Sequence, residues 1–174
     1  MADGLTLYTP WFRSSGGETG RRPMFFANHG GGSNSSHNQG DSTFKIQLGD
    51  TPEVDHTNDF DESNSRFVVP INGYYFVSYN VCIQHGGNRA TEDIGISIRK
   101  NNSVIANYED HSANSRDDRT TFTNMSGSAL FLCAANDQIE LYCTPYNGYD
   151  VGDSSAFTIG TGHRTNMMGF LLGF

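Results

Sequence analysis

The sequence predicts an all-β protein, and both its composition and its hydrophobic pattern support that prediction. Residues that favour helices are scarce, with 9 Ala, 8 Leu, 6 Glu and 2 Lys among 174 residues. By contrast there are 20 Gly, 17 Ser, 16 Asn and 14 Thr, which favour turns, caps and strand faces. A chain of this length can bury a core without disulfides or metals. From residue 44 onward, short alternating segments recur between turn signals, as in a sandwich or barrel.

The clearest strand runs through residues 74–83 and is rather apolar on both faces. One face carries Tyr75, Val77, Tyr79, Val81 and Ile83. The other face carries Tyr74, Phe76, Ser78, Asn80 and Cys82. A strand of this kind needs cover on both sides, which a sandwich strand at a subunit interface has.

Later segments follow the same period of two. Isoleucines at 94, 96 and 98 alternate with Gly95, Ser97 and Arg99, and this strand ends at a hairpin-like turn at 100–102. Residues 127–133 form the next strand. After a turn at 134–137, a further strand runs through 138–143 with Ile139 and Leu141 inward.

The last segment, residues 167–174, is so apolar that we expect a central strand. An exposed edge of this kind would aggregate. The polar stretches 30–40, 107–121 and 148–152 are expected to be surface loops, because they are rich in Gly, Ser, Asn and charged residues.

Residues 1–22 differ from the rest and form a predicted N-terminal arm. An apolar cluster that includes Leu5, Leu7, Trp11 and Phe12 is followed by a Ser- and Gly-rich linker at 14–22. Two interpretations stay open. The arm folds back as an edge strand of its own domain, or its aromatic residues dock on another subunit.

The charge balance excludes some classes of function. A net charge of −8, without any basic stripe, argues against nucleic-acid binding. No segment has the roughly 18 consecutive apolar residues that a membrane-spanning helix needs. The N-terminus lacks the basic and apolar regions of a signal peptide, so we expect no cleaved secretory signal.

No catalytic or metal-binding pattern stands out, so the sequence predicts a protein that is not an enzyme. A Gly-x-Ser-x-Gly motif is absent, and the six histidines lie in or beside polar stretches, where we expect them on the surface. Cys82 and His85 are three residues apart, but no second close pair completes a metal site. We expect Cys82, Cys133 and Cys143 to be buried free thiols.

The middle of the chain resembles the C1q-like domain of the C1q/tumour-necrosis-factor jelly-roll family. The resemblance is carried by Gly73-Tyr74-Tyr75-Phe76-Val77-Ser78-Tyr79 together with Asp55, Phe60 and Phe67 at the family's spacing. Residues 96–101, 126–130 and 134–139 resemble later motifs of the family, 169–172 its closing strand, and 23–27 its first strand. Asn136 stands where the family usually has Gly in a turn, and Asn also tolerates left-handed backbone.

This resemblance covers residues 23–174 and implies a ten-stranded jelly-roll sandwich that forms a homotrimer. The residues expected in the trimer interface or the core are Phe67, Tyr75, Tyr79, Phe170 and Leu172. No collagen-like Gly-X-Y run precedes the domain, so we expect no stalk.

The first functional hypothesis is a virion structural protein, because the chain resembles the C1q-like modules of bacteriophage particles. It would be a trimeric capsid decoration (cement) protein whose anchor is Leu5, Leu7, Trp11 and Phe12. Its partner would be the major capsid protein or another virion protein. Its location would be the virion, assembled in the host cytoplasm. Three weak anchors together give avidity.

The alternative is a recognition module, such as the receptor- or glycan-binding knob of a tail fibre. Its binding loops would be 107–119 and 146–153. In the second loop Tyr146 and Tyr149 could stack on a sugar, whereas Asp150 and Asp153 could hold Ca²⁺. A solvated acidic loop explains the same residues without any ligand, and no other cofactor is predicted.

Overall fold

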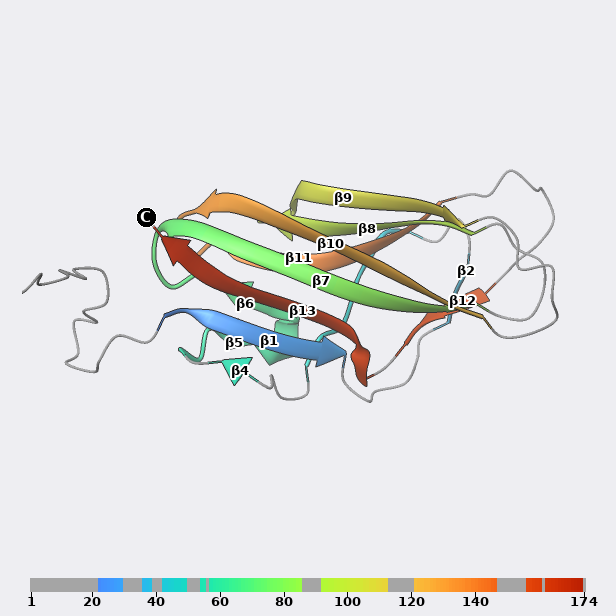
Figure 1. Cartoon of the computed structure of the whole chain (residues 1–174), viewed down its shortest axis with the longest axis horizontal. Coiled ribbons are helices and arrows are strands. Elements are labelled where there is room, and N and C mark those ends of the chain that lie inside the picture. Colours follow the sequence, from blue (N-terminus) through green and yellow to red (C-terminus); the bar gives the residue numbers. More distant parts are fainter. Residues whose placement is uncertain are drawn as a thin grey trace, which may run out of the picture.

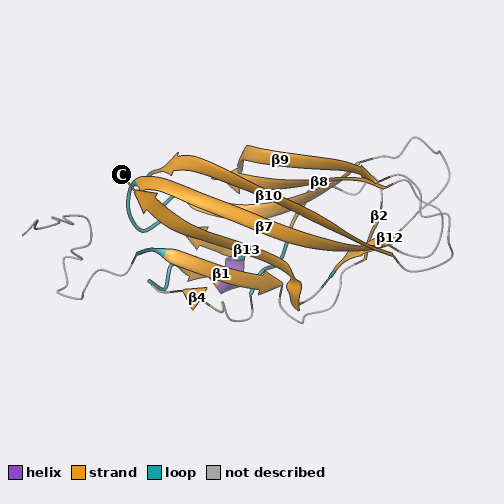
Figure 2. Ribbon diagram, in the orientation of Figure 1, coloured by secondary structure: helices purple, strands orange, loops and turns teal. Residues whose placement is uncertain are grey.

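The computed structural model of the chain describes residues 22–29, 36–38, 42–49, 54–55, 57–85, 92–112, 121–146, 156–160 and 162–173. These residues form two antiparallel sheets stacked as two layers, with one short helix, η1 (Glu62–Asn64) (Figures 1 and 2). The all-β prediction is confirmed. The described residues form no helix that could span a membrane.

Sheet 1 contains the strand that is apolar on both faces. Its strands are β1 (Met24–His29), β2 (Ser36–Asn38), β4 (Val54–Asp55), β7 (Gly73–His85), β10 (Thr121–Cys133), β12 (Ala156–Ile159) and β13 (Gly162–Gly173). On one side β7 pairs with β10 along its whole length, and on the other side it pairs with β13 and β12. Because β13 lies between β7 and β1, the C-terminal strand is central, as predicted (Figure 1).

Sheet 2 covers the inner face of sheet 1. Its strands are β3 (Phe44–Lys45), β5 (Phe60–Asp61), β6 (Arg66–Val68), β8 (Glu92–Lys100), β9 (Ser103–Ser112) and β11 (Gln138–Tyr146). The order is β5-β6-β11-β8-β9, and β3 also pairs with β11. The β8–β9 hairpin turns at Asn101 and Asn102, whose φ angles of 50° and 66° match the predicted tight turn.

The core lies between the sheets and is built from the alternating residues of both. On β7, the inward residues Tyr75, Val77 and Val81 are fully buried, as are Ile96 and Ile98 on β8. This alternation was predicted from the sequence. Five strands have only two or three residues, which is why the described ranges hold thirteen strands where ten were expected.

Two stretches expected to be loops contain strands. Within 30–40, residues 36–38 form β2 and pair with β12. Within 107–121, residues 107–112 complete β9, because Asn107 and Ser112 lie opposite Ser97 and Glu92 of β8. The polar composition misled the sequence interpretation here, because backbone pairing with a long neighbour extends a strand regardless of its side chains.

The turn at 134–137 leads from one sheet to the other, since β10 belongs to sheet 1 and β11 to sheet 2. Asn136 has a φ of 70°, so the left-handed backbone that Asn tolerates is present. The Asp137 carboxylate accepts a hydrogen bond from the Ala134 N–H at 2.9 Å and from the Asn101 side chain at 2.7 Å. The turn is therefore tied to the β8–β9 hairpin.

Candidate functional site

Three of the five residues expected in the interface or core lie in the core. Phe67, Tyr75 and Tyr79 are 0%, 0% and 4% exposed. The Phe67 ring stacks on Phe25 with centroids 4.5 Å apart. Tyr75 donates a hydrogen bond from its hydroxyl to the Ile71 carbonyl at 3.0 Å, and burial raises the pKa of this phenol. These aromatic residues hold the two sheets together and are not available to a partner.

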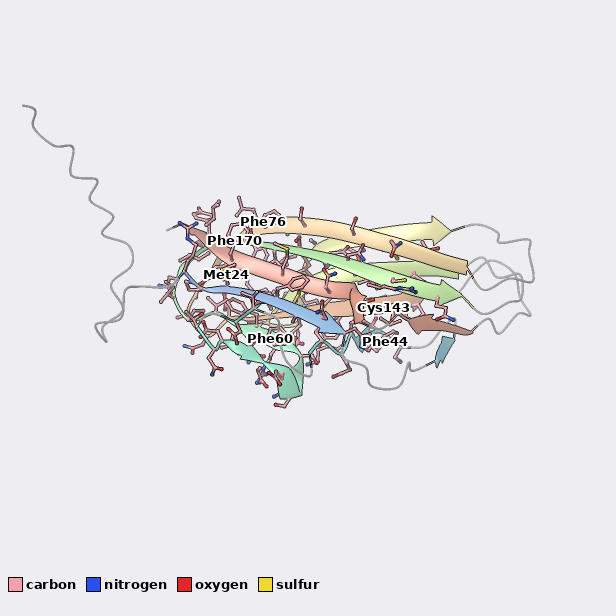
Figure 3. All side chains as sticks on the ribbon, turned by 60° about the horizontal axis from the view of Figure 1, so that its bottom comes forward. Met24, Phe44, Phe60, Phe76, Cys143 and Phe170 are labelled. Carbon is pink, nitrogen blue, oxygen red and sulfur yellow. The ribbon has the colours of Figure 1, made fainter. Side chains whose placement is uncertain are left out.

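The other two residues, Phe170 and Leu172, lie on the opposite side of sheet 1. Phe170 contacts Phe76 with ring centroids 5.5 Å apart, and Figure 3 shows both at the same end of the molecule as Met24. Leu172 is the extra residue of a bulge in β13 and is 52% exposed. The predicted set of five residues therefore included both core residues and residues on the outer side of sheet 1.

Around this pair lies a larger exposed surface that the sequence interpretation did not assemble. We call it the apolar face; its exposed members are Tyr74 on β7, Leu130 and Leu132 on β10, and Met168 and Leu172 on β13. Their exposed fractions range from 37% to 56%. Strand pairing brings them together, since Leu130 lies opposite Phe76 and Phe76 lies opposite Phe170. Sequence alternation suggested outward positions, but only the strand order shows that they adjoin.

At the far end of the same strands the outer side becomes polar. Ser126 of β10 lies opposite Asn80, which in turn lies opposite Asn166 of β13. Asn80 donates a hydrogen bond to the Arg164 carbonyl. The apolar face is thus confined to the end of sheet 1 that holds the beginning of β7 and the end of β13.

The outer side of sheet 2 carries a polar cluster. Lys45 of β3 bonds the Glu140 carboxylate at 2.9 Å and the Asn64 carbonyl at 2.7 Å. Arg99 of β8 lies over the ring of Tyr142, with its guanidinium carbon 4.3 Å from the ring centroid. Burial, and then the nearby Glu140, raise the pKa of Tyr142. These residues are distant in sequence, so no motif predicted the cluster.

The Asp55 and Phe60 spacing of the family motif has a structural role. The Asp55 carboxylate accepts hydrogen bonds from the N–H groups of Asp59 and Phe60, both at 3.0 Å. It therefore ties β4 to the beginning of β5 and places Phe60, whose ring lies 5.5 Å from that of Phe25. Burial raises the pKa of the neighbouring Asp59 carboxyl.

A pocket of about 480 Å³ lies beside the 134–137 turn. It is lined by Asn72, Lys100, Leu132, Cys133, Ala134 and Asp137. Its polar groups are already engaged within the protein: Lys100 donates to the Leu132 carbonyl at 2.9 Å, and Asn72 accepts from the Ala135 N–H at 2.7 Å. These hydrogen bonds stabilise the turn, so we assign the pocket a structural role.

All three cysteines are free and buried, as predicted. Burial raises the pKa of each thiol, to about 11 for Cys133. Each is therefore a weak nucleophile at neutral pH. Among the described residues, no group of three or more His, Cys, Asp and Glu side chains could hold a metal ion. His29 at the end of β1 is 8% exposed, so the expectation of surface histidines was wrong there, because β1 is covered by its neighbours.

Several predicted site residues belong to segments outside the described ranges. Leu5, Leu7, Trp11 and Phe12 lie outside the described residues, as do Tyr149, Asp150 and Asp153. Tyr146 is the last residue of β11, and only its backbone is described. The arm as an anchor and the 146–153 loop as a sugar or Ca²⁺ site therefore stay predictions.

Comparison with known proteins agrees with the two-layer topology. A family model described as the C1q domain matches residues 31–170. No curated protein matches the chain in sequence. The structure is similar to the globular domain of zebrafish complement 1qA (TM-score 0.55, 14% identity, 87% of this chain and 98% of that chain). It is also similar to Eiger TNF from S. frugiperda (TM-score 0.60, 13% identity, 87% and 94%).

Proposed function

The chain belongs to the C1q domain family, and from this premise we propose that it is a non-enzymatic structural module that works as a homotrimer. Domains of this family and of the tumour necrosis factor family typically form homotrimers. The observation that carries the proposal is the apolar face of sheet 1. Its exposed leucines, tyrosine and methionine form one contiguous patch, which in a soluble protein marks an interaction surface.

The charge distribution supports the same surface. The strands β1, β7, β10 and β13 contain one residue among Lys, Arg, Asp and Glu, which is Arg164. The chain as a whole has 30 such residues, 11 basic and 19 acidic. Depletion of charge at the centre of a surface is typical of protein interfaces. These four strands of sheet 1 therefore have the composition of a contact between subunits.

The edge of sheet 1 formed by β10 also favours a contact with another chain. Within the described residues, β10 pairs only with β7, and its 13 residues include no charge and no Pro. A long uncharged edge invites pairing with other chains unless a neighbour covers it. An edge of one copy against the apolar face of the next is a heterologous contact, which a three-fold axis closes.

For the biological setting we retain the virion hypothesis, with this trimer as a phage capsid decoration protein. Residues 1–22 would anchor it to the major capsid protein through the apolar cluster that includes Trp11 and Phe12. The proposed trimer supports this role, because three copies of a weak anchor give avidity without a new contact. The protein would be assembled into the virion in the host cytoplasm.

The test uses the full chain and emptied capsids of its own particle. Substitution of Trp11 and Phe12 by Ala should weaken capsid binding at least tenfold and leave the trimer mass unchanged. Glu18→Gln, in the linker of the same arm, is the matched control and should bind like the unchanged protein. Equal binding by all three proteins would contradict the anchor.

A receptor- or glycan-binding knob is the second candidate. The polar outer side of sheet 2 favours it, because a trimer built on sheet 1 leaves that side open to solvent. If the purified protein labels host cells and competes with intact virus for attachment, this candidate replaces the decoration role.

A further inference from the structure

On the outer side of sheet 2 lies a cation, Arg99, that has no acidic partner among the described residues. Arg99 and Glu140 lie opposite each other on β8 and β11, but the Glu140 carboxylate is neutralised by Lys45 at 2.9 Å. Among the described residues, Arg99 has no ion pair or hydrogen bond, and its guanidinium lies instead on the ring of Tyr142. In a chain of net charge −8, an arginine left without a carboxylate has a positive charge available to a ligand.

Tyr142 holds this guanidinium in place. The Tyr142 hydroxyl lies 3.4 Å from the Glu140 carboxylate and 3.5 Å from the Asn102 side-chain oxygen, so it can donate to one of them. The ring is therefore fixed at its far end. An arginine stacked on a fixed ring loses less conformational freedom when it binds an anion.

A second observation concerns Ser97, two residues before Arg99 on the same side of β8. Ser97 is 3% exposed, and its hydroxyl has no hydrogen-bond partner among the described residues. The same holds for the Nε–H group of Arg99. A buried polar atom without a partner is uncommon and costs free energy, so two of them, two residues apart on one side of β8, call for an explanation.

We propose that Ser97, Arg99, Asn102 and Tyr142 form a binding site for the carboxylate of an acidic sugar. The guanidinium is planar and suits a carboxylate, with which it forms two parallel hydrogen bonds. One available cation among hydroxyl and amide groups matches a ligand with one charge and many hydroxyls. An acidic peptide would need several cations. This site goes beyond the assembly role proposed above and does not depend on it.

The direct test is an NMR titration of the full chain, with sodium glucuronate as probe and glucose as its neutral counterpart. The Arg99 Nε–H resonance, assigned by its loss in Arg99→Lys, should shift and saturate with glucuronate and not with glucose. Acetate should shift it less at equal concentration, because acetate lacks the hydroxyls. Equal shifts with glucose, or no shift with glucuronate, would overturn the site.

Variants distinguish specific binding at Arg99 from a general effect of removing one positive charge. Arg99→Gln should weaken glucuronate binding about tenfold or more, because a charged hydrogen bond is lost. Arg164→Gln removes the same charge from sheet 1 and should leave the affinity unchanged. Ser97→Ala should weaken binding without lowering thermal stability, because its hydroxyl has no partner to lose. Equal weakening by both arginine variants, or tighter binding of a tetraglutamate peptide than of glucuronate, would overturn the assignment.

Discussion

The rings of Phe76 and Phe170 lie 5.5 Å apart on the outer side of sheet 1, away from the core that the same strands build on their inner side. Their neighbours on that side include Leu130 and Leu172, which are 55% and 52% exposed. A sheet that is apolar on both sides has two partners, which here are sheet 2 within the chain and, as proposed, another copy of the chain.

A charge in the apolar face should dissociate the proposed trimer. Leu130→Glu places a carboxylate where the contact excludes water, so the mass in solution should fall to that of one chain while the circular dichroism spectrum is unchanged. Val104→Glu is the matched control, because Val104 is 53% exposed on β9 of the other sheet. Persistence of the trimer in Leu130→Glu, or equal dissociation in Val104→Glu, contradicts the assignment.

Close packing under β13 predicts an effect of a single methyl group. A Cβ at Gly169 would lie 2.7 Å from the Phe25 ring and 3.1 Å from the Phe76 carbonyl oxygen. Gly169→Ala should therefore destabilise the fold by about 1–3 kcal/mol, seen as a lower thermal midpoint. Gly173→Ala, on the same strand, meets no atom within 4 Å and should leave the midpoint nearly unchanged. Equal thermal midpoints for the two variants would contradict this prediction, because β13 could then move to make space for the methyl group.

Removing the cation of the Lys45–Glu140 pair should lower the stability of the fold more than removing the anion. Glu140 is 4% exposed, so Lys45→Met leaves a buried carboxylate without its counter-charge and should cost about 1–3 kcal/mol. Glu140→Gln should cost less, since Lys45 keeps its bond to the Asn64 carbonyl. The double variant should be more stable than Lys45→Met alone. Chemical denaturation measures all three, and additive losses would contradict the coupling.

Acid should weaken the turn at η1 through Asp61. Hydrogen bonds from Asn64, and then from Ser63, lower the pKa of this carboxyl to about 2 from an ordinary value of 3.8. A carboxyl with a lowered pKa contributes stability above its ordinary pKa, and this contribution is lost as the pH falls through the folded value. Thermal midpoints should therefore drop between pH 4 and pH 2.

Asp61→Asn should reduce that drop, whereas Glu62→Gln, which removes a neighbouring carboxylate without cutting these bonds, should keep it. If the pH dependence of Asp61→Asn matches that of the unchanged protein, Asp61 does not contribute.

The sequence predicted the features of the fold that depend on local pattern. Alternation placed Tyr75 and Ile96 in the core, and paired asparagines at 101 and 102 placed the hairpin turn. Strand lengths were less predictable, because residues 107–112 owe their strand to pairing with β8 rather than to their own composition.

The candidate sites were less predictable, because they join residues from strands that are distant in sequence. Phe170 was singled out, but Leu130 was not, since only the strand order β10-β7-β13 places both of them beside Phe76. Likewise, Arg99 and Tyr142 meet because β8 pairs with β11. The spacing of residues within one segment cannot predict contacts between different strands.

The mass of the full chain in solution tests the central claim most directly. Light scattering over a dilution series should give three times the chain mass of 19.1 kDa, with little change down to low concentration. A mass of 19.1 kDa at every concentration would contradict the claim that the apolar face of sheet 1 is a contact between copies of this chain.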